Sequence, residues 1–423
     1  MDTVGRQSLK NLHSNQIVKL IKTAGPISRI EISEKINIPQ PTITRITEEL
    51  LKMNIIKENG LGPSNGGRRP VLLDFNENCY YSIGLEIGRT NMKLALTNLN
   101  GKILAFQHST YDNVQDIVQF AQNSVNEMMK STNIDVTRLL GMGVGMPGPL
   151  FLDDNQVLKS PNFLNGETTN LPEKLHDTFD FPIQFDKDAN VAALAEKWFG
   201  EGIGTSNFIY VMADEGIGCG IVLRDQLYRG VHGEAGGLGH TIVNLFGEKC
   251  TCGNYGCLET LVSKQSILEK VKAQLKAAPP DAKTEFHEDD FNNITVESIS
   301  RAAAEGSSVS QQVLKESGMY LGVGLSNIVS FYDPELIILG GTVGTSHRIL
   351  KDSISDAINQ RVLGVYGKKI KVSLSNTEES IVLGAAALVI DNIFKLFSNH
   401  IQLYDRDQKD AISSSEMEDH LEL

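Results

Sequence analysis

The chain has 423 residues, of which 41% are hydrophobic and 22% charged, and its formal net charge at pH 7 is −13. This length exceeds what one small core needs, so we expect two or three domains of ordinary globular composition. The sequence lacks both a membrane-length apolar run and a signal-peptide core, so we expect a cytoplasmic protein without a membrane partner.

Charge is distributed unevenly along the chain. Residues 1–75 hold eleven Lys and Arg against seven Asp and Glu, a balance of +4, and the remainder carries −17. A basic head on an acidic body predicts that only the head meets double-stranded DNA.

The segment 1–76 has the pattern of a winged helix-turn-helix domain, with three short helices followed by two strands. A capping box at Ser28 and Glu31 opens the second helix, and Pro41 suits the first turn of the third. The expected helices are 11–23, 28–35 and about 41–51, and the expected strands are 55–57 and 71–75.

The third helix is the expected recognition helix, because its first turns carry groups that bond to base edges and phosphates. The loop between the two strands adds a pair of arginines suited to phosphate or a narrow minor groove. The candidate DNA contacts are Gln40, Pro41, Thr42, Thr44, Arg45, Arg68 and Arg69. The alternative for this segment is a three-helix interaction module with solvated charges.

Between residues 80 and 397, a strand meander followed by strand–helix alternation occurs twice, which predicts an α/β body of two lobes. The expected strands are 81–87, 92–97, 102–106, 140–146, 182–185, 209–213 and 218–223. The expected helices are 114–129, 189–199, 259–275, 308–331, 348–361 and 380–397. We expect residues 276–293 to form a surface loop and residues 398–423 a flexible acidic tail.

The most specific pattern is the loop 240–257, which holds His240, Cys250, Cys252 and Cys257. Three thiols and one imidazole match a tetrahedral Cys₃His site, so the loop predicts a structural Zn²⁺. The alternative is free thiols with a loop disulfide, which close spacing and a reducing compartment disfavour. The two other cysteines, Cys79 and Cys219, are expected to be small buried hydrophobes.

The run from Gly239-His240 through Cys250-Thr-Cys252-Gly-Asn-Tyr-Gly-Cys257-Leu-Glu259 resembles the signature of the ROK family, which groups sugar kinases, open reading frames and repressors. The resemblance covers roughly residues 11–392. It implies a hexokinase and actin-like ATPase fold with a sugar cleft between the lobes. It also implies sugar contacts at Asp188, Glu259, His240 and, more weakly, Asn162, with His240 shared between metal and ligand.

Asp188 stands where the family's kinases have their catalytic base, and its place at the start of a helix predicts a lowered pKa. Other positions depart from the kinase pattern. Arg89 replaces a glycine of the first phosphate loop, Asp214-Glu215 alters the second, and Gly237 replaces a sugar-binding Glu. These changes predict that the body keeps a sugar pocket but has lost productive ATP binding, which leaves Asp188 as a vestigial base.

The sequence therefore predicts a sugar-responsive transcriptional regulator, with a repressor as the favoured interpretation. Such a repressor leaves a near-palindromic operator when a small-molecule sugar binds. Such an operator suits a homodimer or a dimer of dimers. Two rivals stay open: an ATP-dependent sugar kinase with a DNA-binding head, and an adaptor whose head binds no DNA.

Overall fold

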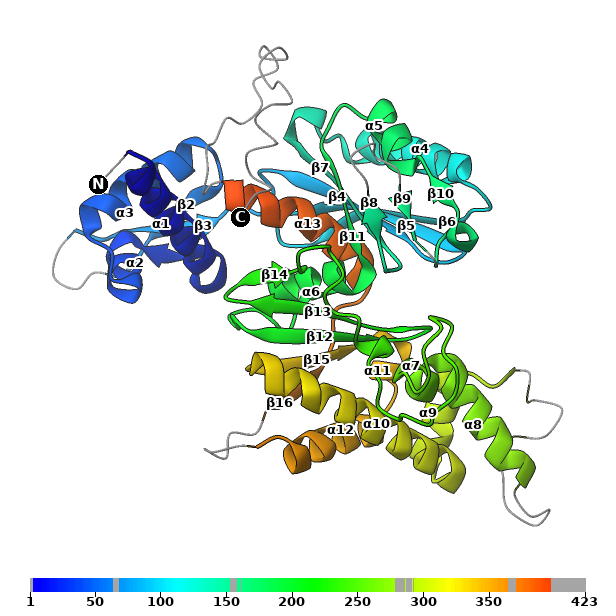
Figure 1. Ribbon diagram of the computed structural model, residues 1–423. Coiled ribbons are helices and arrows are strands. Elements are labelled where there is room, and N and C mark those ends of the chain that lie inside the picture. Colours follow the sequence, from blue (N-terminus) through cyan, green and yellow to red (C-terminus); the bar gives the residue numbers. More distant parts are fainter. Residues whose placement is uncertain are drawn as a thin grey trace. The chain divides into compact units, whose positions relative to one another are not determined.

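Figure 1 shows the computed structural model of the chain, which describes residues 3–63, 68–152, 158–160, 162–277, 286, 291, 293–363 and 370–396. The chain forms two compact units, one built on Met1–Cys79 and one on Tyr80–Ile390. Among the described helices, none combines the length and apolar character needed to cross a bilayer.

The N-terminal unit is a winged helix-turn-helix, as predicted. Its three strands pair in the order β1-β3-β2. The elements are α1 (Thr3–Ala24), β1 (Ile27–Ser28), α2 (Arg29–Ile36), α3 (Gln40–Lys52), β2 (Ile56–Leu61) and β3 (Val71–Phe75). The predicted start of the first helix at residue 11 is wrong, because the helix begins at Thr3. The residues before 11 are mostly polar and lack the apolar periodicity that would have indicated a helix.

Local sequence explains the geometry of this unit. The Ser28 hydroxyl accepts from the Glu31 backbone N–H, and the Glu31 carboxylate accepts from the Ser28 N–H, so the predicted capping box is confirmed. Asn37, with φ 54°, ends α2 in the left-handed conformation that opens the turn. The buried side chains Ile43 and Ile46 fix the inner face of α3 and leave its other face to solvent.

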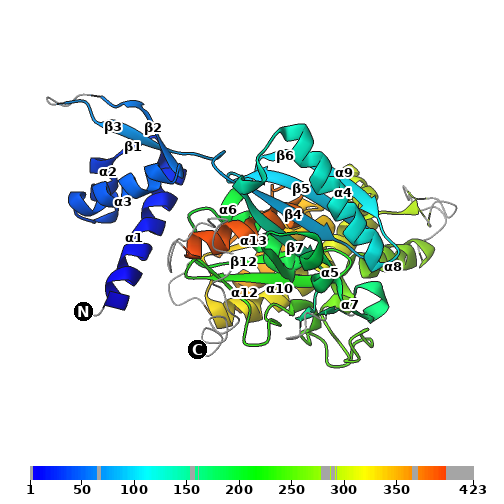
Figure 2. The same ribbon diagram turned by 90° about the horizontal axis from the view of Figure 1, so that it is seen from above.

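The first lobe of the body is a mixed five-stranded sheet in the order β11-β7-β4-β5-β6. Strands β11, β7 and β4 are parallel, and β4, β5 and β6 form an antiparallel meander. Its strands are β4 (Tyr81–Ile87), β5 (Asn91–Asn98), β6 (Ile103–Thr110), β7 (Leu139–Met146) and β11 (Ile183–Lys187). Helix α4 (Val114–Thr132) lies along β5 and β6 (Figure 2) and contacts α5 (Leu171–Thr178). A small separate sheet has the strand order β10-β9-β8, formed by β8 (Phe151–Leu152), β9 (Leu158–Lys159) and β10 (Thr168–Thr169).

The second lobe repeats the design, with a five-stranded sheet in the order β14-β13-β12-β15-β16. Its strands are β12 (Phe208–Ala213), β13 (Ile217–Leu223), β14 (Gln226–Tyr228), β15 (Leu336–Gly340) and β16 (Lys371–Leu374). Its helices are α7 (Glu259–Val262), α8 (Lys264–Ala277), α9 (Val296–Glu305), α10 (Ser308–Tyr332), α11 (Gly341–Gly344) and α12 (Arg348–Arg361). The predicted two-lobed α/β body is therefore confirmed.

Two helices pack against these sheets and place the site. Helix α6 (Asp188–Phe199) follows β11, and α13 (Ser380–Leu396) packs on the first-lobe sheet. A Cβ on Gly84 would lie 1.9 Å from the carbonyl oxygen of Val382, and one on Gly143 would lie 1.8 Å from that of Ala385. Glycine is therefore required where α13 meets β4 and β7.

Some predicted elements differ from the structure. The single helix predicted over 259–275 is wrong, because Ser263 is extended, with φ −66° and ψ 159°, and separates α7 from α8. Helices α5 and α9 and strands β14 and β16 were not predicted, because each is short. In the predicted loop 276–293, α8 extends to Ala277, and most of the rest lies outside the described residues, as does the predicted tail 398–423.

Candidate metal site, effector site and DNA-binding surface

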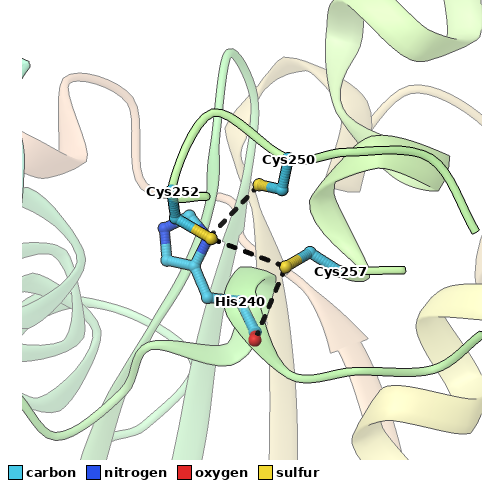
Figure 3. A group of neighbouring side chains, drawn as sticks. All are labelled: His240, Cys250, Cys252 and Cys257. Atoms are coloured by element: carbon cyan, nitrogen blue, oxygen red, sulfur yellow. Dashed lines mark hydrogen bonds between the residues drawn. The ribbon is translucent and has the colours of Figure 1, made fainter. Parts of the chain in front are cut away.

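The predicted metal ligands come together in the loop between η3 (Leu238–His240) and α7, and Figure 3 shows their side chains clustered. The potential ligand atoms of His240, Cys250, Cys252 and Cys257 all lie within 4.8 Å of one another. The Cys252 and Cys257 sulfurs are 3.6 Å apart, and the Cys250 sulfur is 3.7 Å from His240 Nδ1. Thiolates about 2.3 Å from a tetrahedral Zn²⁺ stand about 3.8 Å apart, so the cluster can hold such an ion.

The loop backbone is shaped to bring the sulfurs together. Isolated antiparallel bridges join Ile242 to Cys257 and Lys249 to Tyr255. Gly256 has φ +71°, and a Cβ there would lie 1.6 Å from the carbonyl oxygen of Asn244, so only glycine fits. Cys79 and Cys219 are free and buried, as predicted.

Asp188 begins α6, directly after β11, and is largely enclosed by protein. The prediction of a lowered pKa is wrong: burial raises the pKa of this carboxyl to about 6. Backbone hydrogen bonds from Ala189 and Gly148 and the positive charges of Lys187 and Arg89 act in the opposite direction but do not cancel the burial. Desolvation therefore outweighs the helix dipole at this site.

A second buried carboxyl stands near Asp188. Burial raises the pKa of Glu86, on β4, to about 7, and the negative charges of Glu379 and Asp188 add to the rise, against the attraction of Lys93. Lys93 Nζ lies 2.7 Å from Glu379 Oε2 and 3.8 Å from Glu86 Oε2. Carboxyl groups that titrate near neutral pH thus border the segment where a hydroxyl-rich ligand is expected.

Asn162 is linked to Asp188 through one residue. The Asn162 amide donates to the Gly148 carbonyl oxygen at 2.7 Å, and the Gly148 N–H faces the Asp188 carboxylate. The stem of Lys187 covers Gly148, and its ammonium donates to the Ala235 carbonyl oxygen at 2.5 Å. Residues from both lobes therefore meet around the start of α6.

Glu259 and His240 approach the same region from the second lobe. Glu259 Oε2 accepts a 3.0 Å hydrogen bond from the backbone N–H of Ile217, at the start of β13. A Cβ on the next residue, Gly218, would lie 3.3 Å from the Cβ of Ala189. The first residues of β13 thus lie between Glu259 and the N-terminus of α6. His240 is exposed, and its Nδ1 faces Cys250.

The two acidic residues after β12 are both paired within the second lobe. Asp214 Oδ2 accepts from the backbone N–H of Thr342 at 3.0 Å and from its hydroxyl at 2.8 Å. Glu215 lies 2.9 Å from the ammonium of Lys264. Arg89 is exposed, and its carbonyl oxygen accepts from the Tyr111 hydroxyl at 3.1 Å.

Sequence reasoning missed one buried ionic group beside this region. Asp186 is 5% exposed; its carboxylate accepts from Arg229 Nε at 2.7 Å and from the Asn190 amide at 2.6 Å. The ion pair between Asp186 and Arg229 connects Arg229 to the start of α6. Ala235 is held in the same place, because its N–H donates to the Arg229 carbonyl oxygen. The Asp186–Asn190 spacing was a signal, since residues four apart face each other across a helix start.

On the DNA-binding unit, the exposed face of α3 carries most of the predicted contacts. Gln40, Pro41, Thr44 and Arg45 are exposed, and Thr42 is partly buried. Both wing arginines are exposed, and Arg69 Nε also donates to the Gly62 carbonyl oxygen at 2.9 Å. Arg69 therefore braces the base of the wing.

The fold and site together define a class, namely a DNA-binding protein whose winged head continues into a two-lobed α/β body with a Cys₃His cluster. A family model described as ROK family matches residues 82–392, and one described as winged helix-turn-helix DNA-binding matches residues 11–57. The chain belongs to the ROK family, as a transcriptional regulator with a winged helix-turn-helix.

Two relatives align with nearly the whole chain, and a third aligns with about three quarters of it. A xylose repressor of Caldicellulosiruptor bescii is 32% identical over 390 residues, which is 91% of this chain and 97% of that protein. A ROK family transcriptional regulator, described as a homologue of the E. coli MLC protein, aligns with TM-score 0.76 and 28% identity over 92% of this chain and 98% of its own. A Streptomyces griseus ROK glucokinase, solved with glucose and AMPPNP, aligns with TM-score 0.63 and 26% identity, covering 74% of this chain and 99% of its own.

Proposed function

We propose that this protein is a sugar-responsive transcriptional repressor of carbohydrate-utilisation genes. The observation that carries the proposal is the joining, in one chain, of an exposed α3 face and a ROK body that aligns with both a repressor and a sugar-bound kinase. In this proposal the head binds a near-palindromic operator as a homodimer or dimer of dimers in the cytoplasm. Selection from a random duplex pool tests it: enrichment of a palindromic site is expected, and none would favour an adaptor.

The sugar is proposed to bind where Asn162, Asp188, Glu259 and His240 approach one another. An ionised Asp188 accepts hydrogen bonds from sugar hydroxyls, and Asn162 and Glu259 contribute further polar groups. Because these residues come from both lobes, a bound sugar stabilises one lobe arrangement over another. The repressor leaves its operator when, in the sugar-bound arrangement, the distance between the two DNA-binding heads of the dimer no longer matches the spacing of the operator half-sites. Xylose is the first candidate, from the C. bescii relative.

The Cys₃His cluster is proposed to hold a structural Zn²⁺. Filling all four positions with protein ligands leaves no open position for catalysis, so the ion would serve to fix the loop. With Nδ1 facing the sulfurs, His240 leaves Nε2 for the sugar or an orienting partner. Metal, ligand and loop geometry are then coupled through a single side chain.

The sugar affinity should depend on pH through Asp188. Its pKa of about 6 lies above the usual 3.8, so between these values the folded protein holds a proton that the unfolded chain has lost. If the ionised form is the acceptor, affinity falls below pH 6, by at most about tenfold per pH unit. Glu86, with its pKa of about 7, is the neighbouring group that also titrates.

Isothermal titration with xylose at pH 5.0 to 7.5 measures this dependence, with Asp188→Asn and Glu86→Gln separating the two groups. The Asp188→Asn protein should bind weakly at every pH and melt at a higher temperature at pH 7.5, because a buried charge has been removed. An unchanged pH profile in that variant would assign the titration elsewhere.

A second candidate function is an ATP-dependent sugar kinase, which the alignment with a nucleotide-bound glucokinase favours. Against it, the Asp214 carboxylate accepts hydrogen bonds from the Thr342 N–H and hydroxyl, and Asp214 lies in the run that resembles the second phosphate loop of the family's kinases. A polyphosphate there would face like charge, and each such pair costs roughly 1 kcal/mol at 4 Å in water.

We therefore expect no phosphorylation when the metal-loaded protein is incubated with ATP, Mg²⁺ and xylose, glucose or N-acetylglucosamine. A coupled assay for ADP release measures this, with a ROK glucokinase as the positive control. Sustained turnover with any of the three sugars would contradict the proposal of a sugar sensor and favour a sugar kinase.

A further inference from the structure

The loop that carries the metal ligands also exposes a concentration of large apolar side chains. The structure describes fifteen exposed side chains of this kind, and four of them lie within residues 242–255, whereas the others are spread from Ile30 to Leu363. The four, here called the loop patch, are Ile242, Leu245, Phe246 and Tyr255, exposed by 51%, 78%, 97% and 57%. None of them is a metal ligand or a proposed sugar contact, so the proposed function gives them no role.

Backbone hydrogen bonds hold the loop patch together as one surface. Leu245 and Phe246 are the two corner residues of a tight turn over 244–247, which is closed by a 3.0 Å hydrogen bond from its last N–H to its first carbonyl oxygen. The N–H of the first turn residue donates to the Gly256 carbonyl oxygen at 3.3 Å, which places the turn beside Tyr255. The remaining member of the patch is held by its antiparallel bridge to a metal ligand. The loop therefore presents these side chains on a fixed backbone.

The size of the loop patch matches the apolar part of a subunit interface. A large side chain offers about 150–250 Å² when fully exposed, so at their exposed fractions the four together offer roughly 400–700 Å². A stable protein–protein interface buries about 800 Å² on each partner, of which about 60% is apolar, or roughly 500 Å². Apolar patches of this size on a soluble protein mark interaction sites.

We propose that the loop patch is the surface through which two copies of this chain pair about a two-fold axis. Glu248 and Lys249 are the only charged residues within 242–255, so this segment carries no net charge, whereas the chain beyond residue 75 carries −17. A neutral surface lets two acidic bodies approach each other, and it offers no excess of basic groups to nucleic acid or an anionic membrane. The inference rests on the proposed function, because a homodimer on a palindromic operator needs one self-complementary surface.

Pairing through this loop joins the subunit interface to the proposed sugar contacts. His240 and Glu259 stand at the two ends of the loop, whose base is closed by the Leu258 N–H donating to the Thr241 carbonyl oxygen at 2.9 Å. A sugar that shifts either end therefore shifts the loop patch, and with it the arrangement of the two copies. This gives the proposed sugar response a physical route from one subunit to the other.

The test is sedimentation velocity of the full-length, zinc-loaded protein, with metal content measured on each sample. The wild type should be at least dimeric, and the double variant Leu245→Ser/Phe246→Ser should have half its mass while keeping one zinc per chain. Phe246→Ser alone, at a side chain almost fully exposed in its own copy, should weaken self-association at least tenfold. Phe331→Ser is the matched control, because Phe331 is 83% exposed near the end of α10, outside the loop patch, and should keep the wild-type mass.

Four results would overturn pairing through the loop patch: a monomeric wild type, a double variant that keeps both its zinc and the wild-type mass, an equal loss of mass in Phe331→Ser, or wild-type protein that sediments with phosphatidylserine vesicles when Phe246→Ser does not. If the double variant loses its zinc, Phe246→Ser decides.

Operator release, measured separately on the wild type, keeps this question apart from the proposed function. A wild type that leaves its palindromic operator on sugar addition, while the double variant keeps its mass, would refute the loop patch alone. A double variant of half the mass, with a wild type whose operator binding no sugar affects, would refute the sugar response alone.

Discussion

Substituting Cys257 by serine should remove the bound metal and lower the melting temperature by roughly 5–10 °C. Structural zinc contributes folding free energy directly, and a loss of 1 kcal/mol lowers the Tm of a large domain by about 2–4 °C. Cys257 is fully buried and closes the loop by its bridge to Ile242, so its loss frees the whole loop. The same variant should lose its sugar response, because His240 is no longer oriented.

Metal content per chain by mass spectrometry, together with thermal melting, checks this prediction. Lys249→Ala is the matched control, since Lys249 is exposed in the same loop but is not one of the four clustered ligands. It should keep one zinc per chain and the wild-type Tm. A Cys257→Ser protein with full metal content and an unchanged melting curve would show that the cluster is no structural site.

Substituting Arg45 by alanine should weaken binding to the selected operator by roughly 10–100-fold, since a bidentate contact to a base edge contributes about 1–3 kcal/mol. Arg45 is exposed near the start of α3, whose inner face is fixed by buried Ile43 and Ile46, so the substitution should leave the fold intact. Binding to random DNA should fall less, which separates base recognition from phosphate attraction.

Fluorescence anisotropy at two salt concentrations measures both affinities. Lys52→Ala serves as the control, because Lys52 is an exposed cation in the last turn of the same helix. It should change operator affinity by no more than a few-fold. Equal losses on operator and random duplex in Arg45→Ala would place this side chain on phosphate and not on a base.

Much of the fold follows from local sequence. The capping box at Ser28 and Glu31 sets the start of α2, and long apolar runs mark β4, β7 and α10. Clustering of the metal ligands was also predictable, because all four lie within one short loop with glycines at its turns. In these cases the signal and the structure that it specifies lie close together in the chain.

Other features depend on contacts between distant residues. The pKa of Asp188 could not be read from its helix position, because burial by surrounding segments sets it. The bond between Asp214 and Thr342 joins residues 128 apart, and sequence alone gave only the presence of an extra carboxylate. Short elements such as β16, with four residues, form because a neighbouring strand is already in place.

The most direct test of the account is operator affinity in the presence of sugar. The zinc-loaded wild type and Asp188→Asn are each titrated onto the selected duplex with and without xylose, glucose, N-acetylglucosamine or cellobiose. The account predicts that at least one sugar weakens wild-type binding tenfold or more and leaves the Asp188→Asn complex unaffected. A wild-type complex whose affinity stays the same with all four sugars would contradict it.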